Sequence, residues 1–440
     1  MKPKFAAALM IATALLGGCN TFRKGKAKTP VIGERIAVLA SEADVVIDPA
    51  TASAPFSLPA ATINTEWTQP GGNAAKSMGN LALAKPLRLA FSVPAGAGTT
   101  VKARLAGSPV VSGDRLYTID TSATVRAFDS RSGAMIWARQ FGTQQREAAS
   151  LFGGGVSIGD GRLFATNGLG FVAALDPATG AVAWQVRPGG PLRGAPTVVG
   201  DTIYVMSQDN QIYSLKAADG ATNWSSAAAL EIAGVFGNAS PAVAQGTVVA
   251  GFSSGELNAY RYENGRVVWQ DALARTSITT SVASLSDIDG NPVIDNGQVF
   301  AVGQGGRMVA VDLVSGQRVW ELNLAGIATP WVAGEWVFVV TSDAKLICIA
   351  RNTGKVRWIN QLPAFEHEKS KKGPINYVGP ILAGDRLIVG GSSGALIEVD
   401  PSTGTFQGQT SLGASLSLAP VVANSTLYLL DSRGRLQAYR

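Results

Sequence analysis

Short apolar runs separated by turn residues recur along most of the chain. Runs of Val, Ile, Leu and Tyr alternate with Gly-Asp or Ser-Gly turns, as in "SPVVSGDRLYTID" (108–120) and "APTVVGDTIYVMS" (195–207). Runs of this composition, bounded by glycine and aspartate, are typical of antiparallel strands. No segment sustains the 3.6-residue apolar period of a helix, so the pattern predicts an all-β protein.

A second phrase follows these runs at a nearly regular interval. "VRAFDSRSGAMIW" (125–137) returns as "VAALDPATGAVAW" (172–184) and in five further copies, the last of which, "LIEVDPSTGTFQG" (396–408), lacks the tryptophan. The tryptophans are 38 to 51 residues apart, which suits a four-stranded propeller blade. The chain is therefore predicted to form an eight-bladed β-propeller of four-stranded antiparallel blades. The ninth position of every copy is glycine: Gly133, Gly180, Gly220, Gly265, Gly316, Gly354 and Gly404.

The phrase itself is interpreted as architecture. Its glycine follows a D-x-x-T/S turn or similar, where a residue with positive φ joins two strands. Its tryptophan is large enough to fill the space between neighbouring sheets.

Closure of the ring requires a strand from the N-terminal side. The pair of apolar runs that begins each unit occurs eight times, but the glycine phrase that ends a unit occurs only seven times. The last unit stops at "LQAYR" (436–440). An unpaired edge would invite aggregation, so a missing strand is expected. Two segments qualify, 86–96 and 65–72. The first is favoured, because Phe91 lies 46 residues before Trp137, in phase with the repeat.

The N-terminus reads as an export signal. "MKPKFAAALMIATALLGGCN" has two lysines, an apolar run too short to span a bilayer, and small residues before Cys19. The "LGGC" ending resembles a bacterial lipoprotein box, in which the cysteine is lipidated; the alternative is ordinary cleavage beside an incidental cysteine. We expect a signal peptide at 1–18, a lipid-anchored tether and N-terminal extension at 19–85, and the propeller at 86–440. Asn20 after the cysteine favours the outer membrane by the same resemblance.

Charge and residue usage exclude several classes of function. Residues 1–35 hold seven Lys/Arg and one acid, which leaves 30 bases and 30 acids over 36–440. Nucleic-acid binding would need a clustered basic footprint on the domain. The single histidine, His367, lies in a charged stretch, Cys348 lies in an apolar run, and no Cys/His cluster has zinc spacing. No catalytic set, no metal site and no cofactor is predicted, and the chain is expected not to be an enzyme.

The repeat phrase resembles that of pyrroloquinoline-quinone (quinoprotein) propellers, and the whole chain, lipoprotein box included, resembles the BamB family of outer-membrane lipoproteins. In that family a leucine-serine-aspartate-x-aspartate loop binds the periplasmic domains of BamA. Leu285, Ser286, Asp287 and Asp289 of "SLSDIDGNPV" (284–293) match that loop. A second family loop reads leucine-x-leucine-arginine-glycine before serine/alanine-proline. It is assigned to "AGVFGNASP" (233–241), where Val235 fits and Phe236 replaces the arginine.

The resemblance implies a non-catalytic scaffold of the β-barrel assembly machinery. It implies lipid anchoring at the periplasmic face of the outer membrane, BamA periplasmic (POTRA) domains as partner, and unfolded outer-membrane proteins as further partners. The longest connectors between blades, 270–291 and 359–378, emerge on one side of the ring, where binding is expected. The loop at 285–289 is expected to be exposed to solvent. The alternative function is a periplasmic quinone-dependent dehydrogenase. A member of that enzyme family would be expected to have two adjacent cysteines.

Overall fold

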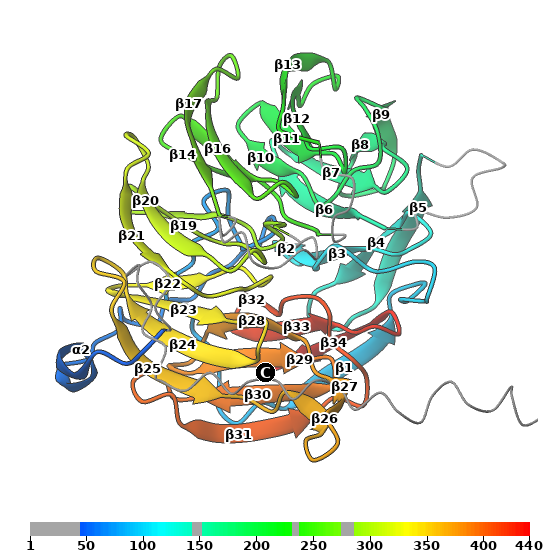
Figure 1. Cartoon of the computed structure of the whole chain (residues 1–440). Coiled ribbons are helices and arrows are strands. Elements are labelled where there is room, and N and C mark those ends of the chain that lie inside the picture. The colour runs from blue at the N-terminus through cyan, green and yellow to red at the C-terminus, as the bar shows by residue number, and fades with distance from the viewer. Residues whose placement is uncertain (1–44, 143–151, 231–236, 274–285) are drawn as a thin grey trace, which may run out of the picture. The chain divides into compact units, whose positions relative to one another are not determined.

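The strands form eight four-stranded antiparallel sheets arranged as a ring (Figure 1). The computed structural model describes residues 45–142, 152–230, 237–273 and 286–440. The eight-bladed propeller predicted from the repeats is confirmed. Within each of blades 1–7, the strands follow one another from the inner strand to the outer strand.

The strand bounds of the first four blades follow chain order. Blade 1 is β2 (Val110–Ser112), β3 (Arg115–Ile119), β4 (Thr124–Asp129) and β5 (Met135–Gln140), and blade 2 is β6 (Gly154–Gly159), β7 (Arg162–Asn167), β8 (Val172–Leu175) and β9 (Val182–Val186). Blade 3 is β10 (Thr197–Val199), β11 (Thr202–Met206), β12 (Gln211–Lys216) and β13 (Thr222–Ala227), and blade 4 is β14 (Ala242–Ala244), β15 (Thr247–Gly251), β16 (Glu256–Arg261) and β17 (Val267–Ala272).

The next three blades repeat this order, and a hairpin projects before blade 7. Blade 5 is β18 (Val293–Asp295), β19 (Gln298–Val302), β20 (Met308–Asp312) and β21 (Arg318–Leu322), and blade 6 is β22 (Trp331–Ala333), β23 (Trp336–Val340), β24 (Lys345–Ala350) and β25 (Val356–Gln361). The hairpin is β26 (Phe365–His367) with β27 (Lys372–Pro374), and blade 7 is β28 (Tyr377–Leu382), β29 (Leu387–Gly391), β30 (Ala395–Val399) and β31 (Phe406–Ser411).

The last blade combines three C-terminal strands with a strand that precedes blade 1 in the sequence. Its strands β32 (Val421–Ala423), β33 (Thr426–Leu430) and β34 (Arg435–Tyr439) are completed by β1 (Leu89–Pro94), which pairs antiparallel with β34. Figure 1 shows the blue β1 beside the red β34. The expectation that 86–96 supplies the closing strand is confirmed, and the other candidate segment serves a different purpose.

The repeat phrase forms the junction between blades, as expected. Gly180 has φ +71°, and a Cβ built on it would lie 2.6 Å from the Trp137 ring of the preceding blade. The Trp137 indole Nε1 donates to the carbonyl of Pro177 in that next blade at 3.1 Å. Glycine is thus required twice, by the left-handed backbone and by the ring packed on it. The same contact joins Gly220 to Trp184, Gly265 to Trp224, Gly316 to Trp269, Gly354 to Trp320 and Gly404 to Trp358.

Residues 62–84, here named the crossing segment, run over the ends of the inner strands. The segment bonds to the inner strand or first turn of every blade. Its contacts include Trp67 N to Val111 O (2.8 Å) in blade 1, Ile294 N to Ala75 O (2.8 Å) in blade 5 and Leu81 N to Leu382 O (3.1 Å) in blade 7. Trp67, the alternative closing residue, is therefore part of this segment and is buried.

The crossing segment carries one fully buried lysine. The Lys76 side chain is 2% exposed, and its Nζ donates to the Thr197 hydroxyl at 3.0 Å. Burial lowers the Lys76 pKa from 10.5 to about 7.

The structure places the expected extension residues from 45 onward against the propeller. The helix α2 (Pro49–Ser53), with Asp48 as its N-cap, lies beside the outer strand of blade 6. It has five residues, and no helix in the described ranges is long and apolar enough to cross a membrane. The division at residue 85 and the signal peptide stay predictions.

Candidate protein-binding site

The predicted binding residues belong to connectors that lead from the outer strand of one blade to the inner strand of the next. We name them connector 2–3 (residues 187–196), connector 3–4 (228–241) and connector 4–5 (273–292). Because the inner strands run from these connectors toward the crossing segment, connectors and crossing segment occupy opposite sides of the ring. Val235, Phe236 and Leu285 lie outside the described residues, so their place in a partner site stays a prediction.

The two aspartates of connector 4–5 are buried, and the expectation of an exposed loop was wrong. Asp287 is 0% exposed and Asp289 is 6% exposed. Ile288 between them belongs to the apolar cluster of blades 4 and 5, and its N–H donates to the Phe252 carbonyl at 3.1 Å. Ser286 is half-buried, and its hydroxyl donates to the Ser253 carbonyl at 3.3 Å. Burial of the Ile288 side chain therefore places Asp287 and Asp289 inside the ring as well.

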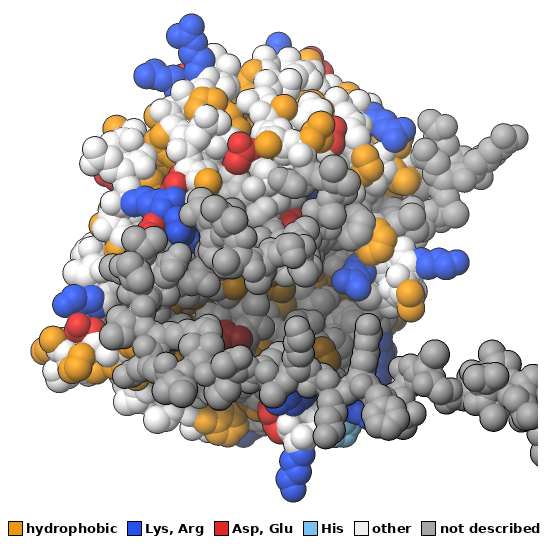
Figure 2. Space-filling model, viewed as in Figure 1, with side chains coloured by type: hydrophobic (Ala, Val, Ile, Leu, Met, Phe, Trp, Pro, Cys, Tyr) orange, Lys and Arg blue, Asp and Glu red, His pale blue; other side chains and the backbone are white. Residues whose placement is uncertain are grey.

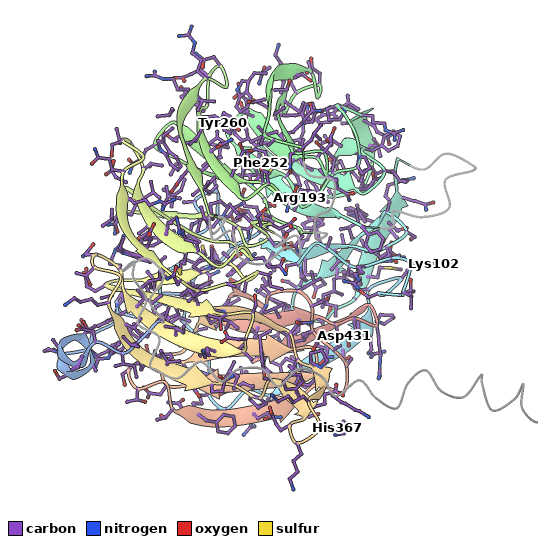
Figure 3. The ribbon with its side chains drawn as sticks, in the orientation of Figure 1. Lys102, Arg193, Phe252, Tyr260, His367 and Asp431 are labelled. Atoms are coloured by element: carbon purple, nitrogen blue, oxygen red, sulfur yellow. The ribbon has the colours of Figure 1, made fainter. Side chains whose placement is uncertain are left out.

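Asp289 is held by an arginine from a different connector. Arg193 of connector 2–3 is 3% exposed, and its Nη2 lies 3.2 Å from Asp289 Oδ1 and 3.4 Å from the Ile288 carbonyl. Gly237 of connector 3–4 packs on the pair, since a Cβ there would lie 1.8 Å from Asp289 Oδ1. Figure 3 places Arg193 toward the middle of the ring. Three successive connectors therefore meet at one buried ion pair.

The sequence prediction missed Arg193, although a signal for it was present. The resemblance called for leucine, arginine and glycine ahead of serine/alanine-proline, and this pattern was assigned to 233–241. Leu192, Arg193 and Gly194, followed by Ala195 and Pro196, match its second half one connector earlier, while Gly190 stands at the first leucine. An arginine in this sequence context is thus present at position 193, and it contacts Asp289.

Burial controls the electrostatics of this cluster. It raises the pKa of Asp289 to about 6; the Arg193 charge opposes this shift, and Asp287 adds to it. Burial also lowers the pKa of Arg193, against the attraction of both carboxylates. Within the described residues, Asp289 Oδ2 and Arg193 Nη1 have no hydrogen-bond partner. A buried ion pair of this kind fixes geometry more than it adds stability.

Further hydrogen bonds tie connector 3–4 to distant parts of the same side. Asn238 Nδ2 donates to the Ala106 carbonyl ahead of blade 1 at 2.7 Å. Ser240 N donates to Asn291 Oδ1 at 2.7 Å, and Asn291 N donates to the Thr329 hydroxyl at 3.0 Å. These bonds link the connectors ahead of blades 1, 4, 5 and 6. The described parts of these connectors therefore hold one another in place.

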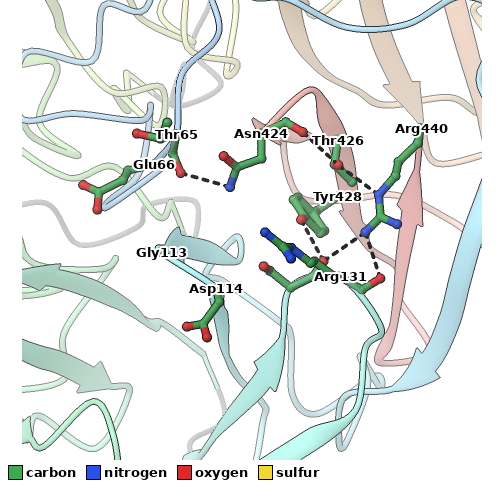
Figure 4. A pocket seen from close by; sticks show the side chains of 10 residues that line it. Thr65, Glu66, Gly113, Asp114, Arg131, Asn424, Thr426, Tyr428 and Arg440 are labelled. Atoms are coloured by element: carbon green, nitrogen blue, oxygen red, sulfur yellow. Dashed lines mark hydrogen bonds between the residues drawn. The ribbon is translucent and has the colours of Figure 1, made fainter.

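A groove also lies elsewhere, at the seam between blades 8 and 1. Its volume is about 650 Å³, and Figure 4 shows its polar lining. Arg440 Nη2 donates to the Arg131 carbonyl at 2.8 Å, and the Tyr428 hydroxyl donates to the Ser130 carbonyl at 2.9 Å. These bonds join blade 8 to blade 1, so we interpret the groove as part of ring closure.

The rest of the described surface offers little chemistry. Figure 2 shows Lys and Arg spread around the rim of the visible face. His367 is exposed on the β26–β27 hairpin, and Cys348 is fully buried. The described residues contain no group of three or more His, Cys, Asp or Glu side chains placed to hold a metal ion.

A ring of eight four-stranded blades, with an aromatic ring against a glycine at successive junctions, defines the chain as a β-propeller of the quinoprotein-like repeat class. The family described as "Outer membrane protein assembly factor BamB" matches residues 121–360, and the chain belongs to this family. The BamB of Escherichia coli strain K12 is 28% identical over 284 residues, covering 55% of this chain and 70% of that protein.

Solved structures agree on the fold. The crystal structure of BamB from Moraxella catarrhalis has a TM-score of 0.65 at 21% identity and covers 80% of this chain and 97% of its own. A europium-containing methanol dehydrogenase has a TM-score of 0.69 at 13% identity, covering 85% of this chain and 98% of its own. At these identities the likeness shows the fold alone, so an enzyme and an assembly factor are equally compatible with the architecture.

Proposed function

We propose that the chain is a non-catalytic scaffold of outer-membrane β-barrel assembly that docks on the periplasmic POTRA domains of BamA through its connector side. The observation that carries this proposal is the convergence of connectors 2–3, 3–4 and 4–5 on the Arg193–Asp289 pair. Membership in the BamB family supports it. Unfolded outer-membrane proteins are proposed as further partners.

Within this site the residues divide into two roles. Asp287, Asp289 and Arg193 are buried, so they hold the connectors in position beneath the docking surface. Leu285, Ser286, Val235 and Phe236 are proposed to meet BamA. An interface organised in this way depends on apolar anchors at its centre, while the buried charges set the geometry of the loops.

The anchoring proposal concerns the N-terminus. After removal of residues 1–18, lipidation of Cys19 would tether the propeller to the periplasmic face of the outer membrane. The acyl chains on Cys19 would supply most of the membrane affinity. Cys19→Ala should therefore release an intact propeller from the membrane fraction; retention in cells that lack BamA would contradict this.

The alternative, a quinone-dependent dehydrogenase, is favoured by the fold alone. The two cysteines, Cys19 and Cys348, are far apart in sequence, so the adjacent pair that this class would require does not exist. After quinone and calcium are added to the purified protein, the absorbance spectrum of the mixture should equal the sum of the spectra of free protein and free quinone. A stable bound chromophore with alcohol-dependent dye reduction would overturn the scaffold proposal.

Binding to the purified periplasmic domains of BamA tests the docking site. Phe236→Ala and Leu285→Ala should each weaken binding by about 1–2 kcal/mol, or about five- to thirtyfold, because truncation of an anchor removes buried apolar contact. The matched control is Asp160→Asn in the exposed β6–β7 turn on the side of the crossing segment. The site assignment is wrong if this control weakens binding as much as the connector variants.

A further inference from the structure

The outer strand of blade 6 already accepts an added segment, supplied by the chain itself. Ile47 forms a parallel bridge with Val356, and Asp48 N donates to the Val356 carbonyl at 2.9 Å. Val45 packs against the apolar cluster that contains Val356. Residues 45–48 thus lie at the edge of β25 and pair with it through one parallel bridge.

A charged contact accompanies this pairing. Asp48 Oδ2 lies 3.3 Å from Nζ of Lys355, the residue immediately before Val356. Farther along the added segment, the carbonyls of Thr51 and Ala54 accept hydrogen bonds from the Arg357 guanidinium at 2.9 Å and 2.8 Å. The occupant is recognised by its backbone, by a β-branched residue, and by a carboxylate three positions later.

The same position on other blades is open. Val356 pairs with Ile349 two residues before the blade tryptophan, and Val267 pairs with Tyr260 at the equivalent point of blade 4. Val356 is 2% exposed, whereas Val267 is 48% exposed. The equivalent residues of blades 1, 2 and 7 are also exposed: Met135, Val182 and Phe406. The apolar residue is therefore buried where a segment lies beside it and exposed on these four blades.

Blade 4 alone among these four repeats the cation as well. Arg266 precedes Val267 as Lys355 precedes Val356, whereas the corresponding residues of blades 1, 2 and 7 are Ala134, Ala181 and Thr405. Arg266 is exposed, and no ion pair of the described residues engages it. The neighbouring Val268 is 40% exposed, which widens the apolar strip along β17.

We propose that the edge of β17 is a second binding surface, for an extended segment of another polypeptide that carries a β-branched residue three positions before a carboxylate. Addition of a strand to an open edge gives affinity through the backbone and specificity through side chains. Along the sequence, β17 ends at Ala272 and is followed directly by connector 4–5. This proposal rests on the proposed function, because an unfolded client protein supplies such segments. Its test contains no BamA, so the two proposals can fail separately.

Photo-crosslinking of a peptide to the purified full chain tests the proposal. The probe is a fluorescent peptide with the sequence of residues 43–50, and the protein carries p-benzoylphenylalanine in place of Val268. We expect a crosslink that falls about fivefold with Arg266→Glu, since an exposed ion pair contributes up to about 1 kcal/mol. A peptide with Asp48→Lys should restore the yield on the Arg266→Glu protein, which separates recognition of charge from misfolding.

The matched control places the photoreactive residue at Ala183 in blade 2, beside the exposed Val182 that no cation precedes. Crosslinking there should be weaker and indifferent to the charge of the peptide. Equal yields at 183 and 268, or no response to the charge reversal, would overturn the proposal. Crosslinks from position 268 to residues 45–54 of a second protein copy, without peptide, would identify a second copy as the occupant and would also overturn it. BamA binding can fail or succeed independently of each of these outcomes.

Discussion

Phe91 of β1 lies against Gly133 of blade 1, where a Cβ would come within 2.6 Å of the Phe91 ring. The Phe91 ring also packs on Tyr428 of β33, with centroids 6.5 Å apart. The tryptophan–glycine contact of six other junctions is thus reproduced at the seam by a phenylalanine of the closing strand. The ring is closed by the same side-chain contact that repeats around it.

Substitution of this glycine should be costly for two separable reasons. Gly133 has φ +74°, so Gly133→Ala pays about 1 kcal/mol for the backbone and about 1–3 kcal/mol for displacing the ring. Gly161→Ala is the matched control, because Gly161 has φ +67° with nothing within 4 Å of a Cβ. Urea unfolding should show the larger loss of stability for Gly133→Ala. Equal losses would mean that the Phe91 contact carries no packing constraint.

Truncation separates ring closure from the crossing segment. A chain that begins at residue 86 keeps β1 and should remain soluble with a lower melting temperature, because it loses the hydrogen bonds of residues 62–84 to the inner strands. A chain that begins at residue 97 exposes the edge of β34 and should aggregate. Light scattering and thermal melts distinguish the two. A monodisperse chain from residue 97 would show that closure does not depend on β1.

The sequence predicted the features that repeat and missed those that depend on distant partners. The blade period, the glycine turn and the phase of Phe91 are local or periodic, so they predicted eight blades and the closing strand. The burial of Asp289 depends on Arg193, 96 residues earlier, and on Gly237. The polar residues around Asp289 in the sequence do not indicate that pairing, so its loop was expected to be exposed. The crossing segment was missed for the same reason, since its hydrogen bonds reach every blade but follow no period.

The Arg193–Asp289 pair should behave as one unit in a double-mutant cycle. Arg193→Met leaves two buried carboxylates without their cation, so it should destabilise the fold by about 3–5 kcal/mol. Asp289→Asn should cost less, because Asp287 still attracts Arg193. The double variant should lose less than the sum of the two. The exposed pair Lys345–Asp343 is the control, where Lys345→Met should cost less than about 1 kcal/mol. Additive losses at Arg193 and Asp289, measured by urea unfolding, would show that the two charges are not coupled.

The buried amine of Lys76 should make stability rise with pH. Because burial lowers the folded-state pKa from 10.5 to about 7, the unfolded chain binds more protons than the folded chain between these two values. The free energy of unfolding should therefore increase from pH 7 toward pH 10.5, by up to about 1.4 kcal/mol per pH unit from this group, and this group should contribute no slope below pH 7. Lys76→Met keeps the chain length and loses only the bond to the Thr197 hydroxyl, which still donates to the Pro241 carbonyl at 2.6 Å.

The Lys76→Met variant should be more stable than the parent at pH 7, with the advantage shrinking as the pH rises toward 10. Urea midpoints at half-unit intervals of pH measure this. Lys102→Met, on an exposed residue, should leave the slope unchanged. Parallel pH profiles for the parent and Lys76→Met would mean that the Lys76 amine keeps its ordinary pKa in the folded ring, which requires a water or anion beside Nζ.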